Sequence, residues 1–435
     1  MIIVDSALHE RERTKRPINV GLVGAGYIGR GVTLQIQEFT PGMRVAAIAN
    51  RTPAHAHAAY RDAGVESVRE VRTAAKLDQA VTDGVGVVTD NPETLCQAET
   101  VDVIFEATGA VEHGARTAVA ALENGKHLVL MNAELDATVG PILKVRADRS
   151  GVVVTNADGD QPGVMMNLFR WVRSIGQNPV MAGNIKGFQD RYRTPETQRA
   201  FAEEYGLSPK MATSFADGTK LSMENAIVAN ATGFRAIERG MVGPPCDHVT
   251  EAPDLFSLEE LLDGGRVDYI LGAEPGPGVF VLGYSEHPVR NEYMRHLKMG
   301  AGPLYTFYVP YHLPHLEGPL TAARAVLFHD AAVTPLGPPV CDVITIAKRN
   351  LAEGDLLDGI GGFAAYGVME NSDRAREENL LPMGLSQGCR LLRPISKDDP
   401  VGIDDVVKPS GRTVDRLWEE QIAQFGAVGG RMDTT

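Results

Sequence analysis

The sequence predicts an α/β protein whose first 155 residues form a doubly wound parallel sheet. Two observations favour this fold. A glycine-rich turn joins a buried apolar run at residues 18–23 to a helical pattern that continues to about residue 39. After it, short apolar runs alternate with helical patterns, which is typical of parallel strands with helices on both faces. A chain of 435 residues exceeds one ordinary domain, so we expect further domains after the sheet.

The glycine-rich turn reads Gly24-x-Gly26-x-x-Gly29 and directly follows the first strand. In a dinucleotide-binding turn, the first glycine permits a tight bend and the second lets the backbone approach a pyrophosphate. The third lets helix and strand pack closely, and the helix then presents free N–H groups to the phosphates. We therefore predict that these glycines, with Tyr27 and Ile28 between them, bind a dinucleotide; the alternative is a glycine turn that only packs.

The second strand, at residues 44–49, ends in Asn50-Arg51-Thr52. NAD-binding folds usually carry an acidic residue here for the ribose hydroxyls, about 20 residues past the glycines. This chain has no carboxylate there, and Arg51 is suited to meet a 2′-phosphate. The sequence therefore favours NADP as cofactor over NAD; alternatively, Arg51 is a solvated loop residue.

Two later strands end in polar loops. The strand within residues 101–109 ends at Thr108 and Gly109, a helix follows at 113–124, and the strand at 127–131 leads into a loop at 132–136. Ligands of doubly wound sheets bind at the carboxyl ends of the strands, so we expect Thr108, Gly109, Asn132 and Glu134 near the nicotinamide. Glu134 could equally be a surface acid.

The strand at residues 152–155 is followed by Asp158 and Asp160 among glycines. Two carboxylates beside a cofactor pocket could hold a divalent metal, Mg²⁺ or Mn²⁺, and Asp160 could bind substrate hydroxyls. Alternatively, these residues form an Asx-turn and cap a helix at 164–174.

Three cations follow within eight residues: Lys186, Arg191 and Arg193. On an acidic protein such a group is a candidate docking place for a phosphate or carboxylate of the substrate. A surface strand and turn of mixed charge is the alternative.

Residues 214–233 are expected to be mainly helical, with Asp217 or Thr219 near the helix start. Lys220 and Glu224 then lie one turn apart on one face. Such a pair is by itself usually solvated. Further on, residues 298–317 are dense in polar side chains, of which Lys298 and His312 are candidates for holding a substrate phosphate or hydroxyl.

Composition limits the function classes. The formal net charge of −14 argues against a general nucleic-acid or anionic-membrane binder, and the chain has no apolar run long enough for a membrane span. Residues 1–16 are too charged for a signal peptide and resemble a short surface helix. The four cysteines lack CxxC spacing, so we expect reduced thiols in a cytoplasmic protein.

The order of several motifs resembles homoserine dehydrogenase over residues 17–338. They are the glycine-rich turn, Glu106-Ala-Thr-Gly109, the Asn132 loop, Asp160-Gln-Pro162, Asp217-x-x-Lys220 and Gly300-Ala-Gly302. The resemblance implies that Lys220 donates or accepts the proton with Asp217 as its partner, and that the loop with Gly300 and Gly302 closes over the cofactor. It also implies a homodimer. Lysine suits the role because desolvation can lower its pKa into the working range.

Other phrases are closer to homoserine-dehydrogenase-like oxidoreductases that carry a C-terminal SAF domain, a group that includes the DXR-like reductoisomerases. They include Phe215-Ala-Asp-Gly-Thr-Lys220, Lys298-Met-Gly-Ala-Gly-Pro-Leu-Tyr305 and Leu357-Asp-Gly-Ile-Gly-Gly362. The resemblance implies a Rossmann domain at residues 17–155, an α+β substrate and dimerisation domain at 156–318, and a small β-rich SAF-like domain at 339–410. A helix within 319–330 would return to the first domain.

Three functions remain open from the sequence. The first is an NADP-dependent oxidoreductase acting on a small polyhydroxylated, phosphorylated carbonyl compound, including a reductoisomerase of the 1-deoxy-D-xylulose 5-phosphate type. In that type a metal held by Asp158, Asp160 and Glu224 would promote the rearrangement. The second is a homoserine or sugar-acid dehydrogenase without isomerisation, and the third is a non-catalytic module that binds NADP and a sugar.

Overall fold

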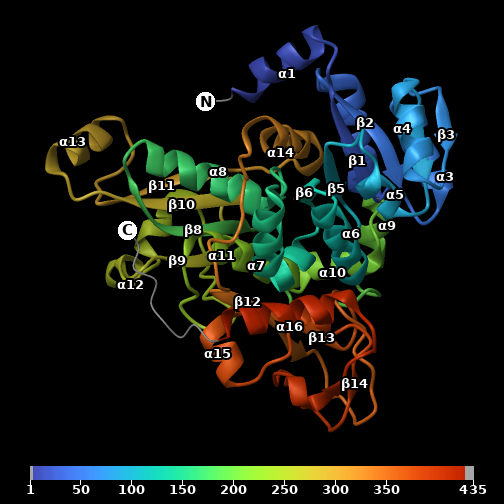
Figure 1. The fold of residues 1–435 in the computed structure, drawn as a ribbon. Coiled ribbons are helices and arrows are strands. Elements are labelled where there is room, and N and C mark those ends of the chain that lie inside the picture. Colours follow the sequence, from blue (N-terminus) through green and yellow to red (C-terminus); the bar gives the residue numbers. More distant parts are fainter. Residues whose placement is uncertain (1–2, 427–435) are drawn as a thin grey trace.

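The computed structural model describes residues 3–426, which form three parts (Figure 1). The first part is a sheet of seven parallel strands in the order β3-β4-β2-β1-β5-β6-β7. The strands are β1 (Ile18–Val23), β2 (Met43–Ala49), β3 (Val68–Glu70), β4 (Gly86–Thr89), β5 (Val103–Glu106), β6 (His127–Leu130) and β7 (Val154–Asn156). The strand order reverses between β1 and β5, so the crevice for ligands lies at the carboxyl ends of these strands. The predicted fold class is therefore confirmed for this part of the chain.

Helices cover the sheet. They are α2 (Tyr27–Leu34), continued by a π-helical turn (Gln35–Phe39), α3 (Pro53–Asp62), α4 (Ala74–Thr82), α5 (Pro92–Gln97), α6 (Val111–Glu123) and α7 (Ala133–Ser150). From far along the chain, α14 (Pro314–Phe328) packs on α2 and β6, and α1 (Val4–Arg13) packs on α14. Buried Val4 and Leu8 attach α1 to this part of the molecule.

The sequence predicts a loop at residues 132–136, and this prediction is wrong. Asn132 caps α7, and the residues after it form the first turn of that helix. Asn132 is the N-cap, and its side-chain oxygen accepts a hydrogen bond from the Leu135 amide at 3.1 Å. An asparagine followed by a carboxylate in the first turn is a helix-start signal, because both groups satisfy or complement free amides. Glu134 therefore has a fixed position on a helix.

The second part is a four-stranded sheet in the order β11-β10-β8-β9. Its strands are β8 (Asn178–Lys186), β9 (Arg266–Leu271), β10 (Gly278–Tyr284) and β11 (Leu304–Val309), and its helices are α8 (Gln161–Ser174), α9 (Arg199–Tyr205), α10 (Pro209–Ala216), α11 (Thr219–Thr232), α12 (Leu258–Leu262) and α13 (Pro288–His296). Helices α8 and α11 pack against the sheet, and α11 also packs on α7 of the first part. Helix α13 lies at the far end of the molecule from β1 and α3 (Figure 1).

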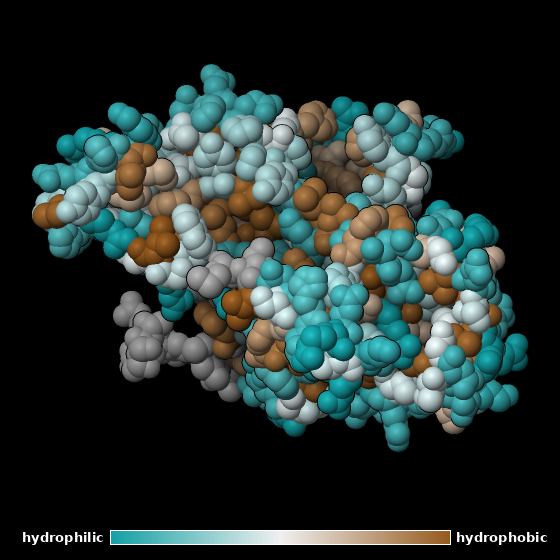
Figure 2. Space-filling model, turned by 90° about the horizontal axis from the view of Figure 1, so that it is seen from above, coloured by the Kyte–Doolittle hydropathy of each residue, from teal (hydrophilic) through white to brown (hydrophobic). Residues whose placement is uncertain are grey.

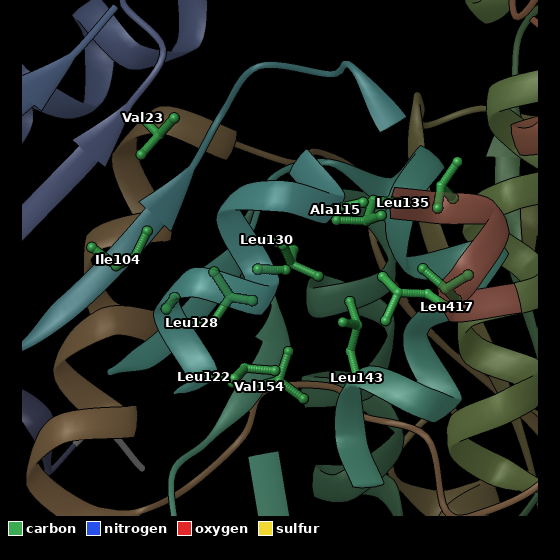
Figure 3. Close-up of a cluster of buried hydrophobic side chains, with 14 of the residues drawn as sticks. Val23, Ile104, Ala115, Leu122, Leu128, Leu130, Leu135, Leu143, Val154 and Leu417 are labelled. Atoms are coloured by element: carbon green, nitrogen blue, oxygen red, sulfur yellow. The ribbon is translucent and has the colours of Figure 1, made fainter. Parts of the chain in front are cut away.

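The third part, which we call the C-terminal unit, contains two short antiparallel pairs. In the first pair β12 (Cys341–Ala347) lies beside β13 (Ala365–Asn371), and in the second β14 (Arg390–Leu391) lies beside β15 (Val406–Val407). Helix α15 (Ser372–Glu377) follows β13, and α16 (Thr413–Phe425) follows β15. Helix α16 packs on α6 and α7, and Leu417 of α16 lies near Leu143 of α7 in one buried cluster (Figure 3). The C-terminal unit thus shares its hydrophobic core with the first sheet.

The surface in Figure 2 carries both hydrophilic and hydrophobic residues, and the hydrophobic ones gather toward the middle of this face. Across residues 3–426, no helix is both long and apolar enough to cross a membrane. Cys96, Cys246, Cys341 and Cys389 are all buried free thiols.

Candidate active site

The glycine-rich turn lies between β1 and α2. Gly24 has φ +102°, a conformation that favours glycine, and a Cβ on Gly29 would lie 2.0 Å from the Gly24 carbonyl oxygen. In contrast, a Cβ on Gly26 would meet no atom within 4 Å, and Gly26 caps α2 without any side-chain hydrogen bond. The first amides of α2 therefore face open space, so the turn fits the phosphates of a dinucleotide.

The end of β2 borders this turn. The Asn50 side-chain oxygen accepts a hydrogen bond from the Ala25 amide at 3.0 Å and so ties the two loops together, whereas Arg51 and Thr52 are exposed. A neighbouring cavity of about 400 Å³ at the ends of β3 and β4 includes Arg72 and Lys76 in its wall. The same wall contains Glu70 and Asp90, so this edge of the sheet offers both cations and carboxylates beside the position where an adenine ribose lies in such folds.

At the end of β5, Thr108 and Gly109 lie beside a carboxyl group that the sequence analysis did not single out. The Glu106 side chain is fully buried and accepts a hydrogen bond from the Thr108 amide at 2.9 Å and another from the Thr108 hydroxyl. Burial raises the pKa of Glu106 to about 7 despite these bonds. The sequence signal for Glu106 as a site residue was an acidic side chain at the end of an apolar strand.

Lys220 is the centre of a buried charged cluster built from three segments of the chain. Its Nζ lies 3.1 Å from Oδ2 of Asp160, which follows β7, and 3.9 Å from Oε1 of Glu224, one turn further along α11. The side chains of Lys220, Asp160 and Glu224 are 12%, 7% and 6% exposed. We call Lys220, Asp160, Glu224 and the nearby Glu134 the Lys220 cluster.

The pKa of Lys220 moves in the direction opposite to our expectation. Burial by itself would lower it, but the carboxylates of Asp160, Glu134 and Glu224 outweigh burial and raise the pKa above its ordinary value. Burial also raises the pKa of Glu224, and Lys220 only partly opposes this effect. Lys220 therefore stays protonated as an ammonium group, and the neighbouring Glu224 carboxyl keeps its proton to a higher pH than an ordinary glutamate does.

Lys186 and His312 lie close enough to interact with this cluster. Burial lowers the pKa of Lys186, partly opposed by Glu224 and Asp217, so the lysine with the lowered pKa is at position 186 rather than 220. Burial also lowers the pKa of His312, whose Nδ1 lies 3.3 Å from the Gly159 carbonyl oxygen.

Asp217 does not pair with Lys220 in this structure. One of its oxygens accepts a hydrogen bond from the Thr219 amide at 2.9 Å, at the start of α11, and the other lies 2.9 Å from Nζ of Lys348 in the C-terminal unit. Lys348 carries no local sequence signal, because the residue it pairs with is 131 positions away.

The two aspartates proposed as metal ligands face different partners. Asp158 accepts a hydrogen bond from Asn167 at 2.5 Å and lies 3.7 Å from Arg324 of α14, whereas Asp160 binds Lys220. Throughout residues 3–426, no group of three or more His, Cys, Asp or Glu side chains is arranged to hold a metal ion. Asp158 and Asp160 therefore do not form a metal site together in this structure.

The structure does not bring the other predicted residues to the cluster. Arg193 pairs with Asp190 at 3.1 Å, and Arg191 lines a separate cavity against the C-terminal unit. Lys298, Gly300 and Gly302 lie between α13 and β11, and α13 is at the far end of the molecule from β1 (Figure 1). Closure of this loop over the cofactor stays a prediction.

A cavity of about 200 Å³ adjoins the nicotinamide end of the predicted cofactor site. Its wall includes Thr108, Gly109 and Glu134 from the first part, Met211 from α10, and Met383 from the C-terminal unit. All three parts of the molecule therefore contribute to the space beside the Lys220 cluster.

Comparison with known proteins defines the class. Residues 18–131 match the model of the oxidoreductase family with an NAD-binding Rossmann fold (GFO/IDH/MocA), and residues 159–318 match the model "Oxidoreductase DRL, catalytic domain". The two matched regions therefore support an NAD(P)-dependent oxidoreductase with a Rossmann nucleotide-binding domain. The carboxyl ends of the first sheet, where both regions meet, carry the Lys220 cluster.

Individual relatives are more distant. The homoserine dehydrogenase of Methylobacillus glycogenes is 30% identical over 173 residues, which are 37% of this chain and 38% of that protein. The chain thus matches less than two fifths of this curated relative. A probable dehydrogenase from Thermotoga maritima is 10% identical with a TM-score of 0.40, covering 74% of this chain and 91% of the other. Apo scyllo-inositol dehydrogenase from Lactobacillus casei is 12% identical with a TM-score of 0.41, covering 72% and 89%.

Proposed function

We propose that this protein transfers a hydride between NADP and a small polyhydroxylated carbonyl compound that carries an anionic group such as a phosphate. The observation that carries the proposal is the Lys220 cluster, a buried ammonium held 3.1 Å from Asp160 directly after β7. The carboxyl ends of the strands are where a nicotinamide and its substrate meet in this fold.

The chemistry follows from the charge of the cluster. When bound, the nicotinamide supplies the hydride to the substrate carbon in reduction and accepts it in oxidation. The Lys220 ammonium donates a hydrogen bond to the substrate oxygen and stabilises the negative charge that forms as the carbonyl electron pair moves onto oxygen. Lys220 then gives a proton to that oxygen and recovers one from the protonated Glu224 carboxyl, 3.9 Å away. Asp160 orients the ammonium.

Lys186 is the proposed contact for the anionic group of the substrate. Lys186 is the last residue of β8 and interacts electrostatically with Glu224. A bound anion would raise the pKa of Lys186, against the effect of burial, and so favour its protonated form. His312, whose Nδ1 lies 3.3 Å from the Gly159 carbonyl oxygen, is the proposed contact for a hydroxyl group of the substrate.

A substrate screen tests the proposal. Phosphosugars, sugar acids and homoserine would be incubated with NADP(H), with and without Mg²⁺ or Mn²⁺, while the nicotinamide absorbance is followed. Lys220→Met should lower kcat/KM by about a hundredfold or more and leave NADP binding intact, because it removes the proton donor and not the phosphate cradle. Lys144→Met, at an exposed pair with Asp148, is the matched control. An absorbance change that persists in Lys220→Met would refute the assigned role.

The second candidate is a reductoisomerase, favoured by the phrases shared with the DXR-like group. Metal-dependent turnover together with a rearranged carbon skeleton in the product would establish it. Turnover without metal and with an unchanged skeleton would establish a simple dehydrogenase. NADP binding with no turnover on any compound, unaffected by Lys220→Met, would leave a non-catalytic binding module.

We also propose a homodimer or larger homo-oligomer. Helix α13 buries none of its residues within the chain, and Tyr293 on it and Leu297 directly after it are each 65% exposed. Exposed aromatic and aliphatic side chains on one segment are typical of a subunit contact. Light scattering of the purified protein would measure the mass, and a monomer at all concentrations would exclude the proposal.

A further inference from the structure

A polar cavity of about 380 Å³ lies between the second sheet and the C-terminal unit. We call it the Arg191 cavity and define it by Gln189, Arg191, Arg239, Tyr269, Tyr366 and Asp398. Its volume is in the range of pockets that hold small metabolites. Ser222, on its wall, lies on α11 between Lys220 and Glu224 and points to the C-terminal unit, where its hydroxyl meets the Gly367 carbonyl oxygen at 3.3 Å.

Arg191 is a cation in the cavity wall that forms no ion pair within the described part of the chain. Among residues 3–426, no carboxylate oxygen lies within 4.0 Å of its guanidinium group, which stands 5.8 Å from the centre of the Tyr366 ring. The neighbouring Arg239, by comparison, is held by Glu370 at 2.5 Å and by Glu378 at 2.6 Å. Arg191 therefore interacts with the neutral Tyr366 side chain but has no carboxylate counter-ion, so it can pair with an anionic ligand.

The acids of the cavity are already engaged. The two carboxylate oxygens of Asp398 accept hydrogen bonds from the hydroxyls of Tyr192 at 2.8 Å and Tyr366 at 3.0 Å. Asp217, also on the wall, pairs with Lys348, and the remaining acid, Glu238, is exposed. Asp398 keeps its negative charge, because tyrosine hydroxyls are neutral donors, but both of its oxygens are occupied by them and it forms no ion pair with Arg191.

A second feature points to a ligand. The side-chain oxygen of Gln189 is buried and accepts no hydrogen bond from any group in the described part of the chain. Buried polar atoms are nearly always paired, so an unpaired acceptor in a cavity wall indicates a missing donor. A hydroxyl group of a bound molecule would supply that donor.

We propose that the Arg191 cavity binds a small organic anion that also carries hydroxyl groups. The carboxylate or phosphate of the ligand pairs with Arg191, and a hydroxyl donates to Gln189. This site is distinct from the Lys220 cluster and requires neither nucleotide nor turnover. Asp217, just before α11, and Ser222 on that helix line the cavity, so an occupant would lie next to the helix that carries Lys220.

Titration calorimetry on the full chain without nucleotide tests the proposal, with D-gluconate as the probe and D-glucose as its uncharged counterpart. Gluconate should bind and glucose should bind at least about tenfold more weakly. Arg191→Gln should weaken gluconate binding about tenfold or more, Gln189→Leu should weaken it several-fold, and Arg191→Lys should retain part of it. Arg173→Gln, an exposed arginine on α8 outside the cavity, is the matched control and should change nothing.

Lys220→Met separates this site from the proposed active site. Gluconate affinity unchanged in Lys220→Met but lost in Arg191→Gln supports the proposal. Loss in Lys220→Met alone, equal binding of glucose, or no heat up to tens of millimolar gluconate would each overturn it. None of these results depends on whether the protein transfers a hydride, so the two proposals fail separately.

Discussion

Lys348 of the C-terminal unit and Asp217 of the second part form an ion pair of 2.9 Å whose side chains are 3% and 0% exposed. The ammonium also donates to the carbonyl oxygens of Arg193 at 2.7 Å and Gly362 at 2.9 Å, so its hydrogen bonds are satisfied. Asp217 in turn binds the Thr219 amide at the start of α11. The C-terminal unit is therefore attached to the helix that carries Lys220.

Replacing Lys348 should destabilise the protein strongly. Lys348→Met leaves the Asp217 carboxylate buried without its counter-ion, which costs about 3–5 kcal/mol. Burial already raises the pKa of Asp217, and loss of Lys348 would raise it further. The protein can then protonate Asp217 at acidic pH, so the loss of unfolding free energy should be smaller there than at alkaline pH. Denaturant titrations at several pH values measure this difference.

Two comparisons complete that test. Lys348→Met combined with Asp217→Asn should recover part of the stability, because no unpaired charge remains buried. Lys144→Met breaks only an exposed pair on α7 and should cost roughly 0–1 kcal/mol. Equal losses in Lys348→Met and Lys144→Met would mean that the buried pair adds nothing to stability.

Gly26 and Gly29 should respond differently to alanine. A Cβ at Gly26 meets no protein atom but enters the space for the phosphates, so Gly26→Ala should keep its melting temperature and lose about tenfold or more in NADP affinity. A Cβ at Gly29 would strike the Gly24 carbonyl oxygen, so Gly29→Ala should lower the melting temperature itself. Thermal melts and nucleotide titration of both variants check this; unchanged affinity in Gly26→Ala would place the nucleotide elsewhere.

Arg51 should determine the preference for NADP over NAD. Arg51→Ala should raise the KM for NADPH about tenfold or more and leave the KM for NADH unchanged, since only the 2′-phosphate loses a charged contact. Asn50→Asp should shift the preference toward NADH, because it restores the carboxylate that binds ribose hydroxyls. Steady-state kinetics with both coenzymes measure the ratio. Parallel changes for NADPH and NADH in Arg51→Ala would contradict this role.

The sequence was most informative where a function depends on local spacing. The glycine-rich turn and the one-turn separation of Lys220 and Glu224 are both visible in a few consecutive residues, and the structure has the expected strand, turn and helices around them. The helix expected within residues 319–330 is present as part of α14, and it packs on α2 and β6 of the first part. Periodicity and helix signals suffice for such features.

The partners of these residues could not be predicted, because they are set by packing of distant segments. Asp160 and Lys348 reach Lys220 and Asp217 across 60 and 131 positions of sequence. The same packing decides the sign of the Lys220 pKa shift: a buried lysine alone would be lowered, and the converging carboxylates reverse the effect. The local sequence also gave no signal that Lys298 follows α13, a helix at the other end of the molecule from β1 (Figure 1).

Glu224 should appear in the pH dependence of the reaction. Its pKa is raised by burial, so a protonated fraction remains at higher pH than for an ordinary glutamate. In our mechanism reduction consumes this proton, so kcat for reduction should fall as pH rises through the raised pKa, and oxidation should show the opposite trend. Glu224→Gln should remove this limb from the pH profile and lower kcat about tenfold or more, while KM for NADPH stays unchanged because Glu224 belongs to the Lys220 cluster and not to the glycine-rich turn proposed for the phosphates. A Glu224→Gln profile with the wild-type limb intact would assign the titration to another group, with Glu106, whose pKa burial raises to about 7, as the next to substitute.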